Sequence, residues 1–553
     1  MAQSSGSSVL TEFVDELDPI PFIFGALVTF VFIGLAAFRT EWVSNQITTA
    51  FSVFGQGLAW MYLLTMLLML VVCVYLMVSP YGRIKLGEGT PEYSNFSYLA
   101  MFFSAGLSAG IVFFGPVEAL THYSTVPPLF SSGAEAETAS AMVPALAYSI
   151  FHYGVSAWGG YLAIGIPVAY YVYEHGAPFR TSTVLMPVLG MDNLNGIIGR
   201  TIDTLAVIAT LGGIATGLGF IATQILTGIT YRTGIQFGDA ETVLAITGIT
   251  IIFTLSLVAG VDRGIRRLSD FNIAIMAVLL LATFVGGILL SGISELAVLN
   301  TGALAVGTYV QNFFAMSLFT GVGTEGGAAW SSFWTVFYWS WWIAWAPFVG
   351  LFLARISEGR TIREVLFTAL VSMTAVSVVW FTVVGGTSMW LQQSGLVDIL
   401  GAVSQFGDGV AGYALFGALP LGELWQPLFL VLVVTFFATS ADSSTLAVAM
   451  LTTGGKASPS SLNRVFWGVL QGLIASILVV LGGASALRSS VIITGAPFAI
   501  VCVISLVVFI KKLGADHTGM IVDESRSMFR SPEVASKPGQ SASDEAARTH
   551  GDD

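Results

Sequence analysis

The chain alternates between long apolar segments and short polar connections over most of its length. Most of the apolar segments approach or exceed the ~20 residues that an α-helix needs to cross a bilayer. The pattern therefore predicts an all-α integral membrane protein with 12 transmembrane helices. The twelve segments lie at about residues 20–38, 58–79, 98–118, 139–173, 203–230, 241–259, 271–291, 327–354, 364–385, 426–453, 465–483 and 489–510.

Two further stretches, 303–319 and 397–417, are only moderately apolar. We expect them to form amphipathic helices at the membrane surface. Several of the twelve segments are longer than a straight crossing requires, so they must tilt, bend or extend beyond the bilayer. No connection between segments is long enough to hold a separate soluble domain.

Composition supports a membrane protein and argues against a disulfide and against enzymatic activity. Of the 553 residues, 55% are hydrophobic and 10% are charged, and the mean hydropathy is +0.82. A soluble domain has about 25% charged residues. Cys73 and Cys502 lie in apolar segments and are expected to be small core residues, not a disulfide. The five His and the lack of a phosphate-binding Walker motif indicate that the protein is neither an enzyme nor an ATPase, and no cofactor is expected.

The distribution of Lys and Arg predicts the orientation. With both termini inside, the inner loops carry fourteen basic residues and the outer loops only Arg39, Arg232 and Arg488. Such an excess is typical of cytoplasmic loops, so we expect a multi-pass protein of the cell membrane with cytoplasmic termini. The polar, acidic residues 1–19 do not resemble a cleavable signal peptide. The tail from 513 is rich in Ser, Asp, Glu, Ala and Gly and is expected to be disordered.

The eighth apolar segment is unusually aromatic. Residues 333–345 include five of the 13 Trp of the chain. On a helix, Tyr338, Trp341, Trp342 and Trp345 share one face, because positions three and four apart are neighbours. Stacked indoles within a membrane can hold a cation through the negative faces of their rings. An interfacial aromatic belt is the alternative, but belts lie at helix ends and this cluster follows the helix.

Glycine and aromatic residues mark the third and fourth segments. Gly106, Gly110 and Gly115, followed by Pro116, weaken the helix of the third segment. Broken helices are tolerated in membranes where they line a cavity or are buried in protein, although small residues also serve close helix packing. Glu118 is expected to be structural. In the fourth segment we expect a second aromatic wall, with His152 beside it as a hydrogen-bonded core residue; the wall consists of Tyr153, Trp158 and Tyr161.

The tenth segment is rich in oxygen-bearing side chains. Six of them occur between Thr439 and Thr445, a costly number inside a membrane unless they bind something. Hydroxyl and carbonyl oxygens suit hard cations such as Na⁺. Asp442 is either part of a functional site or a structural hydrogen-bonding centre. In the fifth segment, Thr210 could offer an oxygen to a cation or bond its own helix backbone.

These stretches together resemble the betaine/carnitine/choline transporter (BCCT) family over about residues 82–511. The motifs that carry the resemblance are Gly82-Arg-Ile-Lys-Leu-Gly, Pro91-Glu-Tyr, the third segment through Glu118, Trp158 to Tyr161, Trp339 to Gly350 with Ala354-Arg-Ile-Ser, and Thr439-Ser-Ala-Asp-Ser. The resemblance implies two accessory helices followed by two inverted five-helix repeats of the leucine-transporter (LeuT) type, in helices 3–12, with the substrate between them. The implied organisation is a cytoplasmic tail (1–19), accessory helices (20–97), first repeat (98–291), connection with a surface helix (292–326), second repeat (327–512) and disordered tail (513–553).

The resemblance also implies site residues. The family's aromatic box corresponds to Tyr153, Trp158, Tyr161 and Trp342. Further rings completing the cage or its exit correspond to Trp339, Trp341, Trp345 and Phe348. The backbone around Gly106, Ser108 and Gly110 would meet a substrate carboxylate. A sodium site corresponds to carbonyls of Ser104, Leu107 and Phe436 with the hydroxyls of Thr439 and Ser440, and a second sodium site to Thr210.

Three positions depart from the family pattern. Tyr153 stands where the first box residue is usually Trp, and Ser108 stands at the middle glycine of a Gly-x-Gly-x-Gly motif. Both leave the identity of the solute open. Ile214 occupies the place of a second-site threonine, which leaves the number of sodium ions open. We find no Lys or Arg inside a core span, which favours a coupling cation over the fixed arginine of sodium-independent carnitine exchangers.

The leading hypothesis is therefore Na⁺-coupled uptake of a quaternary ammonium compatible solute, with glycine betaine as the first candidate, for osmoprotection by alternating access. Na⁺ would be the coupling ion. Proton-coupled choline uptake and sodium-independent exchange of carnitine or betaine are the alternatives within transport. From another class, the chain could be an osmosensor that signals through its tail. The resemblance implies a homotrimer, and no nucleic-acid partner is expected.

Overall fold

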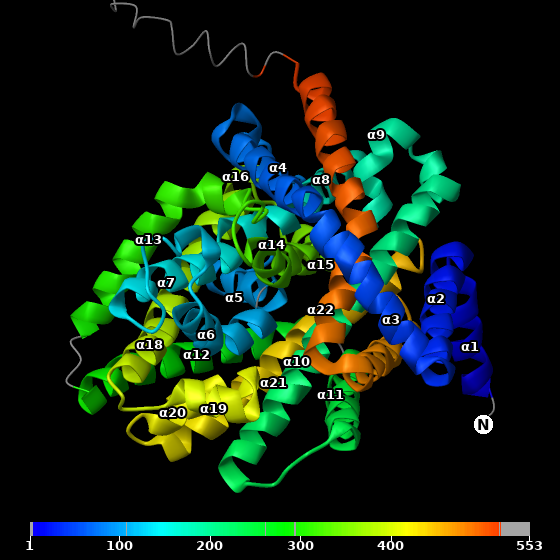
Figure 1. Cartoon of the computed structure of the whole chain (residues 1–553). Helices are drawn as coiled ribbons and strands as arrows, with labels where there is room; N and C mark the ends of the chain where they lie inside the picture. The colour runs from blue at the N-terminus through cyan, green and yellow to red at the C-terminus, as the bar shows by residue number, and fades with distance from the viewer. Residues whose placement is uncertain (1–3, 107, 260, 292–294, 519, 521–553) are drawn as a thin grey trace, which may run out of the picture.

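The computed structural model describes residues 4–106, 108–259, 261–291, 295–518 and 520, and within them the chain is almost entirely helical (Figure 1). Extended backbone pairs among these residues at one isolated bridge, between Lys85 and Thr361. The helices are α1 (Ser4–Glu16), α2 (Pro19–Phe38), α3 (Thr40–Phe51), α4 (Ala59–Val78), α5 (Asn95–Gly106), α6 (Ser108–Ser124), α7 (Ala139–Tyr153), α8 (Val155–His175), α9 (Met186–Leu189), α10 (Ile197–Thr233), α11 (Asp239–Ala259), α12 (Val261–Ser291), α13 (Glu295–Ser317), α14 (Gly327–Ser331), α15 (Phe337–Ile356), α16 (Ile362–Phe367), α17 (Thr374–Trp380), α18 (Gly386–Gln393), α19 (Ile399–Phe406), α20 (Ala411–Ala418), α21 (Gly422–Leu451) and α22 (Ser461–Asp516).

Short helical turns connect or extend these helices. Those of the π type lengthen spans without ending them, for example between α14 and α15. The turns are η1 (Ser52–Gly57), η2 (Pro80–Arg83), η3 (Pro128–Phe130), η4 (Thr181–Leu185), η5 (Asp192–Asn195), η6 (Ser332–Val336), η7 (Thr368–Met373), η8 (Phe381–Gly385) and η9 (Asp408–Val410).

Among the described residues, ten helices are long and apolar enough to cross a membrane. The broken pair of α5 and α6, bent by 66°, makes an eleventh if it counts as one span. The predicted segments 465–483 and 489–510 both lie in α22, on either side of Gly482 and Gly483, whose backbone angles are not helical. At 1.5 Å per residue a straight helix of this length would measure about 84 Å, against a hydrocarbon core of about 30 Å. The count of twelve therefore depends on α22 crossing twice.

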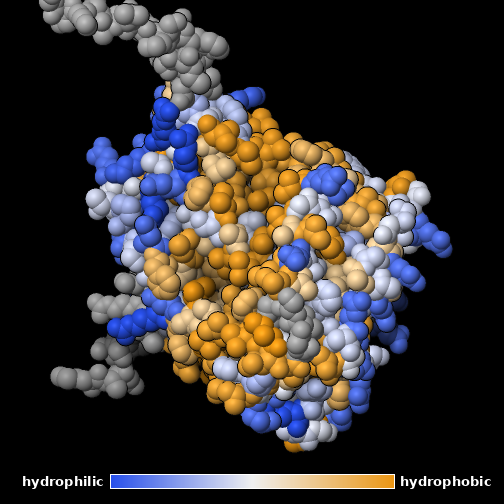
Figure 2. Space-filling model, turned by 90° about the vertical axis from the view of Figure 1, so that its left-hand side faces the viewer, coloured by the Kyte–Doolittle hydropathy of each residue, from blue (hydrophilic) through white to orange (hydrophobic). Residues whose placement is uncertain are grey.

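The spans differ in how much of their surface other helices cover. The most hydrophobic window of the α14–α15 stretch is 100% buried, whereas that of α2 is 28% buried and that of α11 is 22% buried. The α14–α15 stretch thus lies at the centre of the bundle, while α2 and α11 lie at its edge. Figure 2 shows a broad hydrophobic surface on one face of the molecule. Large apolar side chains such as Phe24 and Leu255 are exposed on the edge helices α2 and α11. A surface of this kind is suited to lipid.

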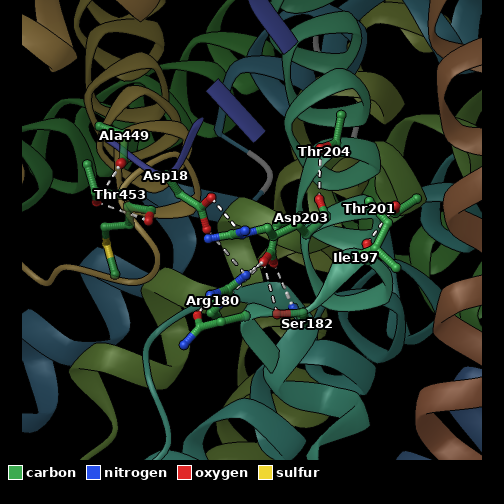
Figure 3. Close-up of polar contacts among 12 residues, drawn as sticks. Asp18, Arg180, Ser182, Ile197, Thr201, Asp203, Thr204, Ala449 and Thr453 are labelled. Atoms are coloured by element: carbon green, nitrogen blue, oxygen red, sulfur yellow. Dashed lines mark hydrogen bonds and ion pairs between the residues drawn. The ribbon is translucent and has the colours of Figure 1, made fainter. Parts of the chain in front are cut away.

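A buried ion-pair cluster joins the start of α2 to the bundle (Figure 3). We call it the Asp203 cluster. Asp203, on α10, accepts hydrogen bonds from Arg180 Nε at 2.7 Å and from the backbone N of Ser182 at 2.8 Å. Asp18, just before α2, lies 2.9 Å from Arg200 Nε, and its backbone N donates to the carbonyl of Thr452 at 2.8 Å. These bonds tie together segments from both predicted repeats and from the first residues of the chain.

The structure corrects the expected position of one charged residue. Arg488 was placed in an outer loop, but it lies within α22, 4% exposed, with its guanidinium 4.1 Å from the ring centroid of Phe333 and 4.5 Å from that of Phe337. The interior of the bundle therefore does contain an arginine, held by aromatic faces. At the two ends of the described chain, α1 precedes the first span and α22 continues to Asp516. Most of the predicted C-terminal tail lies outside the described residues.

Candidate functional site

The aromatic residues of α15 form a continuous stack. The rings of Tyr338 and Trp342 lie 5.8 Å apart at 24°, and those of Trp341 and Trp342 lie 5.2 Å apart at 8°. Trp345 contacts both Trp341 and Trp342 edge-on. The shared face predicted from the three- and four-residue spacing is therefore present. All of these side chains are buried, so the cluster is not an interfacial belt at a helix end.

The fourth predicted span is interrupted in the middle of its aromatic wall. α7 ends at Tyr153, and α8 begins at Val155 after a non-helical Gly154. A Cβ on Gly154 would lie 2.7 Å from the carbonyl oxygen of Ile150, so only glycine fits this break. Tyr153 is consequently carried by one helix, and Trp158 and Tyr161 by the next.

The four residues of the predicted box form one chain of ring contacts. Tyr153 and Trp342 are 5.4 Å apart between centroids, Trp342 and Tyr161 are 6.2 Å apart, and Tyr161 and Trp158 are 5.8 Å apart. Each is 0% exposed, so the site is closed to solvent in this conformation. We call this set the four-ring box.

Two glycines of the third predicted span lie directly beside the four-ring box. A Cβ on Gly106 would lie 2.6 Å from Trp158 and 3.3 Å from Tyr161, and one on Gly110 would lie 3.0 Å from the hydroxyl of Tyr153. The backbone at both glycines can approach the rings because no side chain intervenes. Leu107 is outside the described residues, as is the side chain of Ser108.

The remaining predicted cage residues lie around this box and differ in their contacts. Trp339 packs against Phe151 at 5.0 Å, and its described ring contacts do not join it to the four. Trp341 donates from its indole N–H to the carbonyl of Gly213 on α10, at 3.0 Å. Trp345 and Phe348, 5.2 Å apart, extend the line of rings along α15.

Polar atoms in the box are of two kinds. Tyr161 donates from its hydroxyl to the carbonyl of Gly106 at 2.7 Å, and Trp342 donates from its indole N–H to the carbonyl of His152 at 3.0 Å. These two bonds fix the rings to the backbone. In the part of the chain that the structure describes, the hydroxyl of Tyr153 and the indole N–H of Trp158 have no hydrogen-bond partner.

A buried network next to the box was not predicted as a unit. Glu118 receives hydrogen bonds from His152 Nδ1, at 2.7 Å, and from the hydroxyl of Tyr338. The other nitrogen of His152 is 3.0 Å from the hydroxyl of Thr335. Glu118, His122 and His152 have the chemistry to ligate a metal, but both carboxylate oxygens and both His152 nitrogens already have protein partners. The expected role of His152 as a hydrogen-bonded core residue agrees with these contacts.

Two of the predicted sodium ligands, Ser104 and Ser440, contact each other where α5 meets α21, and two more lie on α21 close to Ser440 in sequence. Ser440 donates from its hydroxyl to the carbonyl of Ser104 at 3.1 Å, and Thr439 donates to the carbonyl of Phe436 at 2.7 Å. The rings of Phe103 and Phe436 pack beside them, 5.8 Å apart. Hydroxyl and carbonyl oxygens at the junction of two helices form a donor set that fits Na⁺.

The other candidate oxygens lie apart from that junction or have different partners. Thr210 is fully buried, and its hydroxyl is unpaired among the described residues, so it does not bond its own helix. Ile214, at the position where the family has a threonine, is also buried. Asp442 accepts a hydrogen bond from Ser256 on α11 at 2.7 Å, which agrees with the structural one of its two expected roles.

Comparison with known proteins identifies the class. The model of the betaine/carnitine/choline family transporters matches residues 21–518. The glycine betaine transporter OpuD of Bacillus subtilis is 36% identical over 497 residues, which cover 89% of this chain and 94% of that protein. A betaine/ectoine transporter, LcoP, of Corynebacterium glutamicum is 36% identical, covering 90% and 78%. A glycine betaine/proline/choline transporter of Vibrio parahaemolyticus is 34% identical and covers 83% of each chain.

A solved structure of a Na⁺-coupled sialic acid symporter also aligns, with 16% identity over 85% of this chain and 86% of that chain, at a TM-score of 0.39. That likeness is too low to support an argument about this fold. The family model covers residues 21–518, and the relatives at 34–36% identity are transporters that match along most of their length. The protein is therefore a multi-pass membrane transporter and not an enzyme. It belongs to the betaine/carnitine/choline transporter family.

Proposed function

We propose that this transporter carries a quaternary ammonium compatible solute, with glycine betaine as the first candidate, into the cell together with Na⁺. The single observation that supports this most is the four-ring box, in which aromatic residues from α7, α8 and α15 surround the glycines of α5 and α6. A trimethylammonium group has no hydrogen to donate, so ring faces are the groups suited to hold it. Each cation–π contact contributes roughly 0.5–2 kcal/mol.

Na⁺ would be a co-substrate. The oxygens of Ser104, Phe436, Thr439 and Ser440 would hold it, where α5 of the first repeat meets α21 of the second. Binding there would favour the conformation in which the two helices are joined. In the structure each of the two hydroxyls donates to one of the two carbonyls, so the ion would take the place of these hydrogen bonds.

Transport requires that a closed site opens on each side of the membrane in turn. All four box rings are buried, so a solute can enter only after helices move. The helices are already interrupted between α5 and α6 and at Gly154, between α7 and α8. Movement at these two breaks requires few further backbone hydrogen bonds to be broken. Alternating access between the two repeats, in the cell membrane and with both termini inside, is the mechanism we propose.

Direct binding tests this proposal. Purified full-length protein in detergent would be titrated with glycine betaine in NaCl and in KCl, with tryptophan fluorescence as the readout because Trp342 lies in the box. We expect binding that is at least tenfold tighter in Na⁺. Equal affinity in the two salts would remove the coupling assignment, and no binding would remove the solute class.

Proton coupling is the second candidate, and the buried network of Glu118 and His152 is the observation that favours it. These groups lie within hydrogen-bond distance of each other and adjacent to Tyr153. If binding is the same in NaCl and KCl, a dependence on pH that is lost in Glu118→Gln would support this candidate.

A further inference from the structure

The hydroxyl of Tyr153 is a buried polar group whose partner is not supplied by the protein. The side chain is 0% exposed, and within the described ranges no group meets the geometry of a hydrogen bond with its oxygen. The nearby hydroxyl of Tyr338 donates its own hydrogen to Glu118. Leaving a hydroxyl unpaired in an apolar interior is unfavourable. A ligand atom that accepts this hydrogen bond would remove the penalty.

Tyr161, the other tyrosine of the box, provides the contrast. Its hydroxyl donates to the carbonyl of Gly106 at 2.7 Å, so it serves to fix the ring and the break in the third span. Both tyrosines are fully buried and contact Trp342. Of these two tyrosine hydroxyls, only that of Tyr153 is available to a solute.

The position of this hydroxyl is defined by Gly110. A Cβ placed on Gly110 would lie 3.0 Å from the oxygen and 3.2 Å from the ring of Tyr153, and 3.4 Å from Trp342. Gly110 belongs to the first turn of α6, a helix of 17 residues. The first turn of a helix has unpaired backbone N–H groups and a partial positive charge, both favourable to an anion. The hydroxyl therefore lies at the border between the ring faces and an anion-attracting helix end.

The surroundings of Tyr153 hold the hydroxyl in place. Its ring packs against Tyr338 at 5.2 Å and Phe381 at 5.0 Å, in addition to Trp342. The preceding residue, His152, is fixed by Glu118 through the 2.7 Å hydrogen bond. A donor held this firmly loses little entropy when it binds a ligand.

We propose that Tyr153 is a specificity-determining residue, whose hydroxyl donates a hydrogen bond to the carboxylate of a zwitterionic quaternary ammonium solute. The ring faces would hold the ammonium end, and the hydroxyl beside Gly110 would select solutes that have an acceptor with a negative charge. This assignment rests on the proposed function. It predicts that the transporter distinguishes glycine betaine from choline, which carries the same ammonium group but no carboxylate.

The test compares Tyr153→Phe with Tyr161→Phe in the purified full-length protein, with glycine betaine and choline as probes. Tyr153→Phe removes one oxygen that has no partner in hydrogen-bond geometry among the described residues, so without solute its melting temperature should be no lower than that of the wild type. We expect its dissociation constant for glycine betaine to rise about tenfold, because a hydrogen bond to a charged acceptor is lost, and its dissociation constant for choline to change less than twofold. Tyr161→Phe should weaken both probes to a similar extent, because it loosens the box itself.

The outcomes separate this assignment from the proposed function. Wild-type protein that binds neither probe overturns the proposed function and this assignment with it. Wild-type binding, followed by an equal change for both probes or no change in Tyr153→Phe, overturns the assignment alone. A selective loss of glycine betaine affinity in Tyr153→Phe, absent in Tyr161→Phe, establishes it.

Discussion

The Asp203 cluster and the four-ring box are both buried, yet they treat their polar atoms in opposite ways. In the Asp203 cluster, each oxygen of Asp203 accepts hydrogen bonds from Arg180 or Ser182. The cluster atoms that make no hydrogen bond, among them Arg180 Nη2 and Arg200 Nε, lie within ion-pair distance of a carboxylate. In the box, the hydroxyl of Tyr153 and the indole N–H of Trp158 have no partner among the described residues. Buried polar groups that have a hydrogen-bond or charge partner are typical of structural centres, whereas a buried hydroxyl without one, such as that of Tyr153 beside Gly110, indicates a place for a ligand.

This difference leads to separable effects. Damage to the Asp203 cluster should lower stability without changing the affinity of the folded protein for its solute. Substitutions in the box should lower the affinity for the solute, and should lower stability only by the packing that the removed side chain contributed.

Arg180→Met should have the largest effect, on stability. It leaves the carboxylate of Asp203 buried without its charge partner, a change that costs about 3–5 kcal/mol. The melting temperature of the detergent-solubilised protein should fall sharply, while the folded fraction binds glycine betaine as the wild type does. Arg200→Met is the matched control: the Arg200 side chain is 31% exposed where it meets Asp18, so its effect should be much smaller. Equal shifts in the two variants would contradict the special role of the buried pair.

Trp342→Leu should weaken glycine betaine binding about 30-fold, because it removes a ring face worth up to about 2 kcal/mol from the centre of the box. Trp339→Leu is the control, since Trp339 lies on the same helix, is equally buried, and packs on Phe151 instead of on the box. Both variants lose similar packing and should lose similar stability. Binding measured by calorimetry separates them, and an equal loss of affinity would show that the four rings are not the binding groups.

Ser440→Ala should raise the Na⁺ concentration needed for half-maximal uptake about tenfold, because one oxygen donor is lost where α5 meets α21. Thr435→Val, on the same helix, removes a hydroxyl that bonds its own backbone carbonyl at Val431, and should leave this concentration unchanged. Uptake titrated with NaCl at constant ionic strength gives both values. An unchanged Na⁺ requirement in Ser440→Ala would argue against this junction as the ion site.

The smallest effect concerns the docking of α1. Burial acts to raise the pKa of Glu16, but hydrogen bonds from Ser460 and Lys456 outweigh it and lower the pKa below 4.5. A lowered pKa in the folded state stabilises docking above the ordinary pKa of a glutamate, and this contribution is lost as pH falls through the lowered value. Proteolysis near α1 should speed up about fivefold in Glu16→Gln at pH 7. It should also speed up in the wild type, but not further in the variant, on acidification.

Much of the helical architecture could be predicted from the sequence because each span carries its own signal. The apolar segments located the membrane helices, and the spacing of Tyr338, Trp341 and Trp342 predicted their common face. The resemblance to a known family supplied the pairing of Tyr153 and Trp158 with Trp342, which no local pattern contains. The structure brings these residues together and leaves Trp339 beside them, against Phe151.

Contacts between residues far apart in the chain could not be predicted from local sequence patterns. Glu118 bonds Tyr338, 220 positions away, and Arg180 bonds Asp203 across the connection between α8 and α10. Arg488 looked like a loop residue because it lies between two apolar segments. Within α22 its charge is instead covered by the rings of Phe333 and Phe337, a compensation that depends on the fold and not on neighbouring residues.

The measurement that tests the central claim most directly is uptake of radiolabelled glycine betaine into proteoliposomes, with and without an inward Na⁺ gradient, in the wild type and in Trp342→Leu. We predict accumulation that requires the Na⁺ gradient in the wild type and is lost in the variant. Accumulation that is independent of Na⁺, or that persists without the Trp342 ring, would contradict the account.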